Sequence, residues 1–372
     1  TDWYIDQMKR QAYNSSPIPA QIEHKNYAYG VREGIYFRKR TENRWNIKDF
    51  VNWITSDDPN TQETRGEGEY KQTFYYYPTN KIRIPVNKEN VLKSGIVKPE
   101  DADKIVDYID ITLPNAIDKA RIVMLDILAN NDWKRPIYFT GGSMDSAEYL
   151  WMKDYLQLDG LVYKLVPIKT PIDKNNPYDM GRIDSELMYN IVKRWTWGNM
   201  GKEGIYLDPE TRKNSIIFRG NLARLTEQLI AEGKTAKASE IIDIAMKNMP
   251  IDAYGYYFTL DPFIEGSYKV GKKEQARAIA LQVIKKYQEE LNYYTHLPAG
   301  ELNSNAKRIQ YCIDRYGEVV MLSETLDKEF YTAQWAIFKD KAGLFMGEKE
   351  LEEYFKGAAS QAASASVSAS QS

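Results

Sequence analysis

Hydrophobic and polar positions along the first part of the chain predict strands that alternate with helices. Residues 46–55 place apolar side chains at helical spacing (i, i+3, i+4, i+7), whereas residues 104–113 alternate apolar and polar positions as a strand does. The same reasoning predicts further helices over residues 2–13 and 87–94, and another that runs from a cap at Asn115 or Asp118 to residue 131. It also predicts strands over residues 36–37, 72–77 and 81–86.

The connections between these elements carry turn signals. Pro78, Thr79 and Asn80 separate two β-prone runs, which predicts a hairpin with a three-residue connection. Residues 56–69 are polar, contain Pro and Gly and lack an apolar period, so we expect an exposed loop there.

Residues 133–168 form the most regular unit of this first part. They predict a buried strand over 136–140, a Gly-Gly-Ser turn, an amphipathic helix and a second strand over 161–168. Strands and helices in this order indicate an α+β or α/β domain, which we place over residues 1–182.

The second part of the chain is helical and contains a repeat. A segment rich in Pro, Asn and Asp, residues 169–182, separates it from the first part. Two predicted helix pairs, 221–233 with 235–249 and 261–271 with 273–294, align at a constant offset that places Gly233 on Gly271. We therefore expect a tetratricopeptide-like helical-repeat domain over residues 183–356, with two more helices over 302–326 and 328–345. The Ala/Ser-rich residues 357–372 are expected to be disordered, since they offer little apolar surface to bury.

Composition excludes several classes of function. The net charge is −2 and basic residues are interleaved with acidic ones, so we expect no nucleic acid partner. No apolar run approaches the length that crosses a bilayer, and the chain opens with neither an initiator Met nor a signal-like segment. We therefore expect a fragment or processed form of a longer protein, with any membrane-bound part outside it.

Cysteine and histidine are too sparse for several kinds of site. One cysteine, Cys312, excludes an internal disulfide framework, and its helical surroundings predict a buried, inert thiol. Two histidines far apart in the sequence make a zinc site or a Ser-His-Asp site improbable. We expect no metal and no cofactor. Two carboxylate pairs, Asp2 with Asp6 and Asp107 with Asp110, could act as acid and base only if the fold brought each pair into one cleft.

The glycine turn is the one candidate ligand site in the first part of the chain. Backbone N–H groups at a helix N-terminus attract anions, so a phosphate could dock at Gly141, Gly142 and Ser143, with Arg135 just before the strand. The sequence GGSMDSA is neither GxGxxG nor a P-loop, and the charge of Asp145 would repel an anion. A turn that only changes chain direction is the favoured interpretation.

Several stretches together resemble one family. They are TDWYIDQMKRQAY (1–13), KSGIVKPEDADKIVDYIDITLP (93–114), WKRPIYFTGGS (133–143), YLQLDGLVYKLVPI (155–168) and RWTWGNMG (194–201), together with the helical hairpins. The chain resembles the C-terminal soluble region of a membrane-protein family of Gram-negative bacteria. That family is similar to dolichyl-phosphate-mannose protein mannosyltransferases and has a membrane half of GT-C glycosyltransferase architecture.

The resemblance implies a region on the periplasmic face of the inner membrane, anchored through transmembrane helices that this chain lacks. Full-length members would transfer sugar from a lipid-linked donor to Ser or Thr of proteins, with the catalytic acid in the membrane half, so no catalytic residue is assigned here. The implied partners are the protein's own N-terminal transmembrane region and acceptor polypeptides or another envelope protein.

Three hypotheses follow from these observations: acceptor docking beside a glycosyltransferase, an envelope scaffold without a role in sugar transfer, or an enzyme that binds a nucleotide sugar or sugar phosphate at Gly141, Gly142 and Ser143. The aromatic residues expected to contact a partner are Trp195, Trp197, Tyr254, Tyr256 and Tyr257. For the two tryptophans, a wedge between the domains is favoured over a stacking surface.

Overall fold

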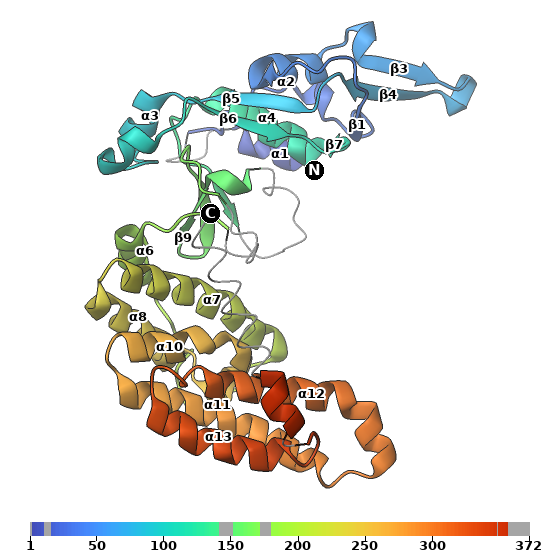
Figure 1. Cartoon of the computed structure of the whole chain (residues 1–372). Helices are drawn as coiled ribbons and strands as arrows, with labels where there is room; N and C mark the ends of the chain where they lie inside the picture. Colours follow the sequence, from blue (N-terminus) through green and yellow to red (C-terminus); the bar gives the residue numbers. More distant parts are fainter. Residues whose placement is uncertain (1, 11–15, 141–151, 172–179, 348, 356–372) are drawn as a thin grey trace. The chain divides into compact units, whose positions relative to one another are not determined.

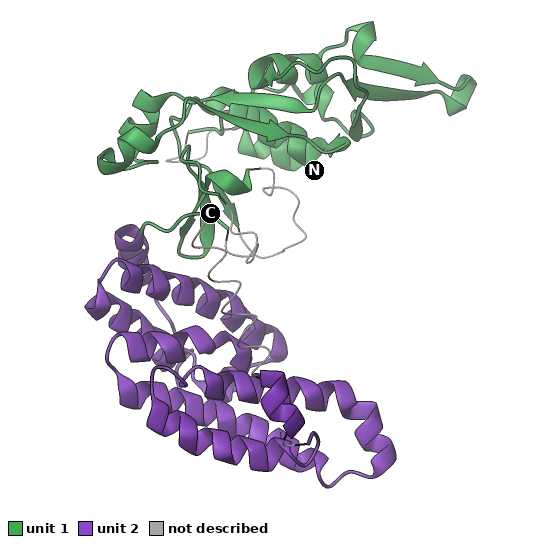
Figure 2. Ribbon diagram, viewed as in Figure 1, with its two compact units in different colours: residues 1–184 green, residues 185–372 purple. Residues whose placement is uncertain are grey.

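A computed structural model describes residues 2–10, 16–140, 152–171, 180–347 and 349–355. The chain divides into two compact units, residues 1–184 and 185–372, coloured separately in Figure 2. The first combines mixed sheets with helices and the second is helical, so the predicted fold class is confirmed: α+β, followed by a helical region (Figure 1).

Unit 1 contains short strands, helices and 3-10 turns. In chain order these are α1 (Asp2–Met8), η1 (His24–Asn26), β1 (Gly34–Phe37), β2 (Trp45–Asn46), α2 (Ile47–Thr55), η2 (Pro59–Thr61), β3 (Gln62–Arg65), η3 (Gly68–Tyr70), β4 (Gln72–Tyr77), β5 (Lys81–Pro85), α3 (Lys88–Lys93), η4 (Pro99–Lys104), β6 (Tyr108–Thr112), β7 (Ala116–Asp118), α4 (Lys119–Asn131), β8 (Tyr138–Thr140), η5 (Lys153–Tyr155), β9 (Leu156–Asp159) and β10 (Val162–Leu165).

The described strands form three small sheets. Their orders are β3-β4-β1-β7, β2-β5-β6 and β8-β10-β9. The pairs β1 with β4 and β2 with β5 are parallel, and the remaining pairs are antiparallel.

Two helices cover this core, and both follow the predicted pattern. Asn46 caps α2 by accepting a hydrogen bond from the Lys48 N–H, and Asp118 caps α4 in the same way from Arg121. The predicted apolar stripe of α2 (Ile47, Phe50, Val51 and Ile54) is buried. It packs against α4 and against β4 and β5.

The predicted hairpin is wrong. β4 has the predicted bounds and β5 ends one residue earlier than predicted, but β4 pairs with β3 and β1 whereas β5 pairs with β2 and β6. The connection at Pro78 therefore leads from one sheet to another. The predicted exposed loop over 56–69 is also wrong in part, because it contains β3, which supplies an edge strand for β4.

The unit predicted over residues 133–168 differs from the structure in topology. β10 pairs antiparallel with both β8 and β9, and β9 with β10 forms a hairpin that was not predicted. β8 is not a buried strand, since Tyr138 and Thr140 are exposed. A strand–helix–strand crossover would have required parallel strands. The predicted glycine turn and amphipathic helix fall on residues 141–151, outside the described residues.

Unit 2 consists of packed helices. They are α6 (Ser185–Val192), α7 (Pro209–Ala231), α8 (Thr235–Asn248), α9 (Ile251–Tyr254), η6 (Tyr257–Thr259), α10 (Asp261–Lys269), α11 (Lys273–Tyr294), α12 (Ala299–Met321) and α13 (Lys328–Ala342). Consecutive long helices contact one another, and α10 also contacts α7 and α8. Residues 349–355 are helical as well, and their Phe355 ring packs on Gly317 of α12.

The predicted repeat is visible in the turns of the helix pairs. Gly233 and Gly271 both have positive φ, at 73° and 81°. In each turn the N–H after the glycine reaches a carbonyl five residues earlier, Lys234 to Leu229 and Lys272 to Ser267, both at 2.8 Å. Equivalent positions in the second helix of each pair, such as Ala238 and Ala276, are buried. The two pairs thus share one hairpin design.

Candidate functional site

Arg135 is the only described member of the predicted glycine-turn site. Its Nη1 donates hydrogen bonds to the carbonyl oxygens of Pro17 at 2.8 Å and Ser16 at 3.5 Å. The guanidinium thus holds the segment at residues 16–17. Gly141, Gly142 and Ser143 lie outside the described residues, so the proposed anion site remains a prediction.

Trp195 and Trp197 form an aromatic cluster with Phe218 of α7. Their ring centroids lie 5.4 Å apart, and each is 5.5–5.7 Å from that of Phe218. All three side chains are half-buried. The tryptophans are therefore anchored on a helix of their own unit and keep part of their surface exposed.

The three tyrosines of the repeat connection differ in exposure. Tyr254 is 1 % exposed and donates a hydrogen bond to the Met200 carbonyl oxygen, so its prediction as a partner contact is wrong. Tyr256 and Tyr257 are half-buried, and Tyr257 packs edge-on against Tyr287. Both tyrosines therefore keep part of their side-chain surface exposed to solvent.

The two proposed carboxylate pairs are engaged elsewhere. Asp6 accepts a hydrogen bond from the Tyr27 hydroxyl at 2.5 Å, and Asp110 accepts two from Arg83 at 2.8 Å. Asp107 forms an ion pair with Lys88, and Asp2 accepts a hydrogen bond from its neighbour Trp3. The hydrogen bonds from Tyr27 and Arg83 lower the pKa of Asp6 and Asp110, which keeps both ionised at neutral pH. These interactions give neither pair an acid–base role.

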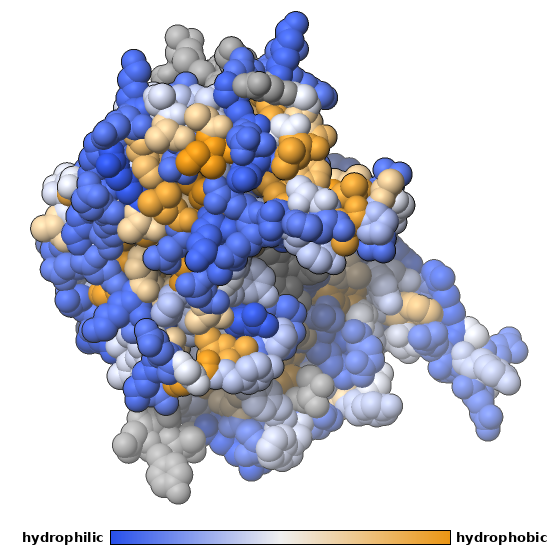
Figure 3. Space-filling view, turned by 90° about the horizontal axis from the view of Figure 1, so that it is seen from below, coloured by the Kyte–Doolittle hydropathy of each residue, from blue (hydrophilic) through white to orange (hydrophobic). Residues whose placement is uncertain are grey.

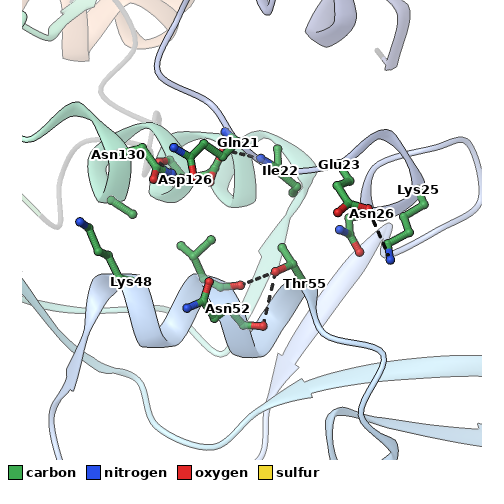
Figure 4. Close-up of a pocket in the computed structure, with 12 residues that line it drawn as sticks. Gln21, Ile22, Glu23, Lys25, Asn26, Lys48, Asn52, Thr55, Asp126 and Asn130 are labelled. Carbon is green, nitrogen blue, oxygen red and sulfur yellow. Dashed lines mark hydrogen bonds and ion pairs between the residues drawn. The ribbon is translucent and has the colours of Figure 1, made fainter.

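A polar pocket of about 480 Å³ lies between α2, α4 and the segment over 21–26 (Figure 4). Its lining is mostly polar: Gln21, Ile22, Glu23, Lys25, Asn26, Lys48, Val51, Asn52, Thr55, Asp126, Ala129 and Asn130. The two helices supply opposite walls because the packing of the α2 stripe against α4 fixes their separation. Sequence reasoning did not predict this site, since its lining residues come from three segments distant in the chain.

Asp126 fixes one wall of this pocket. Its Oδ2 accepts the backbone N–H groups of Gln21 at 2.7 Å and Ile22 at 2.9 Å, and its Oδ1 accepts from Asn130 at 2.8 Å. Burial raises the pKa of Asp126 above its ordinary value, against the effect of these hydrogen bonds. Because both oxygens are engaged, Asp126 positions the segment over 21–26 and is a poor candidate for a general base.

Tyr27 and Lys9 fix the segment from its other side. Tyr27 is fully buried and its hydroxyl donates to Asp6, while Lys9 donates to the Ile22 carbonyl oxygen. Burial and the Asp6 carboxylate raise the pKa of Tyr27, so its hydroxyl stays protonated. The pocket wall is thus tied to both α1 and α4.

Asn26 is a buried lining side chain that is incompletely hydrogen-bonded. It is 3 % exposed, and its Oδ1 has no hydrogen-bond donor. Lys48 and Asn52 lie on α2 among the lining residues and are exposed (Figure 4). The lining contains hydrogen-bonding groups but neither a histidine nor a cysteine, which suits ligand binding better than covalent or acid–base chemistry.

Within the described part of the chain, no group of three His, Cys, Asp or Glu side chains is arranged to hold a metal ion. None of the described helices is long and apolar enough to span a membrane. Cys312 is buried and its pKa is raised to about 12 by burial, which keeps the thiol protonated.

Comparison with known proteins identifies the family. The family model named TMEM260-associated domain 2 matches residues 1–187, half of the chain, and its bounds lie close to those of unit 1. No curated protein and no solved structure matches the chain. The helical unit beyond residue 187 lies outside the family match. The chain belongs to the TMEM260-associated domain 2 family, a domain linked to TMEM260, which is an O-mannosyltransferase-like protein.

Proposed function

We propose that this chain is the periplasmic accessory region of a membrane-bound protein O-glycosyltransferase and that unit 2 docks acceptor polypeptides. The observation that carries the proposal is the family match over unit 1, which links the chain to an O-mannosyltransferase-like protein. The resemblance to Gram-negative bacterial members supports the periplasmic location and the anchoring by transmembrane helices.

The chemistry of unit 1 supports an accessory role. Asp6 and Asp110 are held by hydrogen bonds to other side chains, and both oxygens of Asp126 are occupied. Asp6, Asp110 and Asp126 are therefore all engaged in hydrogen bonds, and none of these three carboxylates is free to activate a nucleophile. Catalysis is therefore assigned to the membrane half of the parent protein, and this region is assigned to binding.

The surface of unit 2 supports polypeptide docking. Helical-hairpin arrays present extended surfaces to their partners. Unit 2 exposes large apolar side chains, among them Tyr206, Tyr293 and Leu344, in addition to the half-buried Trp197 and Tyr256. Figure 3 shows one face of the molecule on which hydrophobic residues gather in patches between hydrophilic ones. Such patches suit an extended polypeptide with apolar side chains.

The test is glycosylation of an acceptor protein by the full-length parent. We expect the double variant Trp197→Ala/Tyr256→Ala to raise the KM for the acceptor about tenfold with little change in kcat, because docking contributes binding and not chemistry. The matched control is Tyr29→Ala, which removes a tyrosine that is 92 % exposed in unit 1. Deletion of residues 185–355 should have a larger effect in the same direction. Unchanged acceptor kinetics in both the double variant and the deletion would overturn acceptor docking.

A second function, a scaffold that recruits another envelope protein, also draws support from the helical repeat. It predicts a stoichiometric partner that is not itself glycosylated and that is lost with unit 2. Crosslinking in the intact envelope, followed by mass spectrometry of the captured protein and its glycans, separates the two functions.

A further inference from the structure

β3 (Gln62–Arg65) is an edge strand with one open side. It forms one end of the sheet β3-β4-β1-β7 and, among the described strands, pairs only with β4. The β3–β4 hairpin extends away from the helices α2 and α4 of its own unit (Figure 1). Because an edge strand presents backbone N–H and C=O groups that have no strand partner, it offers a place where another strand can pair.

The register shows which backbone groups of β3 face the open side. The Arg38 N–H donates to the Tyr77 carbonyl oxygen across the parallel pair of β1 and β4, so Tyr77 directs its backbone groups toward β1. These groups point to alternate sides along a strand, so Thr73 also faces β1 and its partner Thr64 faces the open side. The two threonine hydroxyl oxygens lie 3.1 Å apart, in keeping with a pair that exchanges no backbone hydrogen bond. Thr64 therefore presents a donor and an acceptor at the edge.

The side chains on either side of Thr64 carry opposite charges. Glu63 and Arg65 lie on the same face of the strand because side chains alternate between its two faces. Arg65 Nε donates to Glu63 at 2.8 Å, and Glu63 also accepts from Arg38 Nη2 at 2.6 Å. The Glu63 side chain is 38 % exposed and that of Arg65 58 %. The open edge thus carries an accessible acid and an accessible base, with Thr64 midway between them.

This arrangement is complementary to itself. If two copies of β3 pair antiparallel about a two-fold axis at Thr64, the two Thr64 residues exchange both backbone hydrogen bonds, and each Glu63 lies opposite Arg65 of the second copy. Opposite charges across a strand pair stabilise it, whereas like charges destabilise it. An axis at Glu63 or at Arg65 would place like charges opposite each other. An axis at Gln62 or Glu63 would also need the Gln62 N–H, which already donates to the Pro59 carbonyl oxygen.

We propose that β3 pairs antiparallel with β3 of a second copy of this chain, with the two-fold axis at Thr64 and two reciprocal ion pairs between Glu63 and Arg65. The charges favour a second copy over an arbitrary polypeptide, because a strand without this spacing of acid and base gains only the backbone hydrogen bonds. β3 has four residues, so the interface is smaller than that of stable complexes, and we expect a weak dimer with a Kd of about 100 µM. The proposal goes beyond the proposed function, because it concerns unit 1 alone and does not depend on acceptor docking.

The first test is sedimentation velocity of the 372-residue chain from about 10 µM to about 1 mM. Glu63→Arg and Arg65→Glu each place like charges opposite each other twice in the dimer, so each variant alone should dimerise about tenfold more weakly or less still. In an equimolar mixture the two introduced charges face each other and the two native ones do the same, so dimerisation should return to about the parent level. The control Lys93→Glu reverses an exposed charge on α3 and should change nothing.

The second test locates the two-fold axis by crosslinking. Residues in a hydrogen-bonded antiparallel pair have Cα atoms about 5.5 Å apart, which is within the range of a disulfide. Thr64→Cys should therefore give a disulfide-linked dimer on mild oxidation. The control Thr73→Cys changes an exposed threonine one strand away, and its two copies would lie about 14 Å apart, too far to bridge. The native Cys312 is buried and is common to both variants.

A chain that stays monomeric at every concentration would overturn the proposal, including one whose β3 edge binds an extended acceptor peptide instead. A mixture of the two folded charge variants that fails to restore the dimer would also overturn it, because the edge charges would then not determine the pairing. Circular dichroism establishes which variants are folded. If either charge variant does not fold, the crosslink decides: no disulfide dimer from Thr64→Cys, or equal crosslinking of Thr64→Cys and Thr73→Cys, would refute the axis.

Discussion

Arg219 in α7 is a buried cation whose removal tests how the tyrosine-rich repeat connection is held. Its side chain is fully buried, with Nη1 donating to the Gly255 carbonyl oxygen at 2.6 Å and Nη2 to that of Met249 at 2.8 Å. Nη1 also lies 3.3 Å from Thr259 Oγ1. These acceptors stand at the two ends of α9 and in the turn after it. Arg219 therefore fixes the connection between the two helix pairs.

The substitution Arg219→Met sets two effects against each other. It leaves two buried carbonyl oxygens without donors, at about 1–3 kcal/mol each. It also removes a buried charge: burial lowers the pKa of Arg219 from 12.5 to about 10, which corresponds to about 3 kcal/mol of unfavourable burial. At about 2 kcal/mol each, the two carbonyl losses slightly exceed the gain from removing the charge, so Arg219→Met should lower the free energy of unfolding of unit 2 by about 1 kcal/mol. Arg219→Ala adds a cavity and should cost about 4 kcal/mol.

The assay is urea unfolding of the whole chain, with hydrogen–deuterium exchange of the α7 and α8 backbone amides as the readout. These amides report on the unfolding of unit 2. The control is Arg308→Met, which removes a half-exposed arginine paired with Glu290 and should cost about 1 kcal/mol or less. Greater stability of Arg219→Met than of the parent would refute the reasoning. It would mean that burying the charge costs more than its hydrogen bonds return, as happens for some buried ion pairs.

Three further predictions concern charge, backbone and thiol chemistry. The hydrogen bonds from Lys104 and Arg182 outweigh burial and lower the pKa of Asp101 to about 2. The ionised carboxylate therefore stabilises the folded state fully above about pH 4 and progressively less as the pH falls toward 2. In thermal unfolding, Asp101→Asn should cost about 1–2 kcal/mol at pH 7, and this difference should vanish below about pH 2. Gly233→Ala and Gly271→Ala should each cost about 1 kcal/mol in urea unfolding, because both positions have positive φ. The control Gly300→Ala, in a helix with open space around it, should be neutral or stabilising. Equal effects at all three positions would contradict the turn argument. Because burial raises its pKa to about 12, Cys312 should resist a thiol reagent at pH 8 in the folded chain and react in urea, and rapid labelling of the folded chain would contradict its burial.

Local patterns predicted the elements whose structure is set by neighbours along the chain. The stripe of α2, the cap of α4 at Asp118 and the paired turns at Gly233 and Gly271 depend on spacings of a few residues, and the structure has all of them. Helical periodicity and caps are local signals, so a single sequence contains them.

Strand pairing and the pocket depend on distant residues, and there the sequence was insufficient. Nothing in the sequence around Pro78 distinguishes a hairpin from a connection between two sheets, because both need a short turn between apolar runs. Ile22 and Asp126 meet only through the fold, and Arg219 resembles any basic helix residue until its burial is known. A signal was present in part, since a polar residue such as Asp126 interrupts the apolar face of its helix.

The short link between β4 and β5 mechanically couples two of the three described sheets of unit 1, β3-β4-β1-β7 and β2-β5-β6. β4 ends at Tyr77 and β5 begins at Lys81, in different sheets, and α2 packs on both strands while it lines the pocket. Because the link between β4 and β5 has only three residues, a displacement of either sheet would be transmitted to the other. Tension applied at the edge of one of these two sheets would therefore reach the other sheet and the pocket wall together.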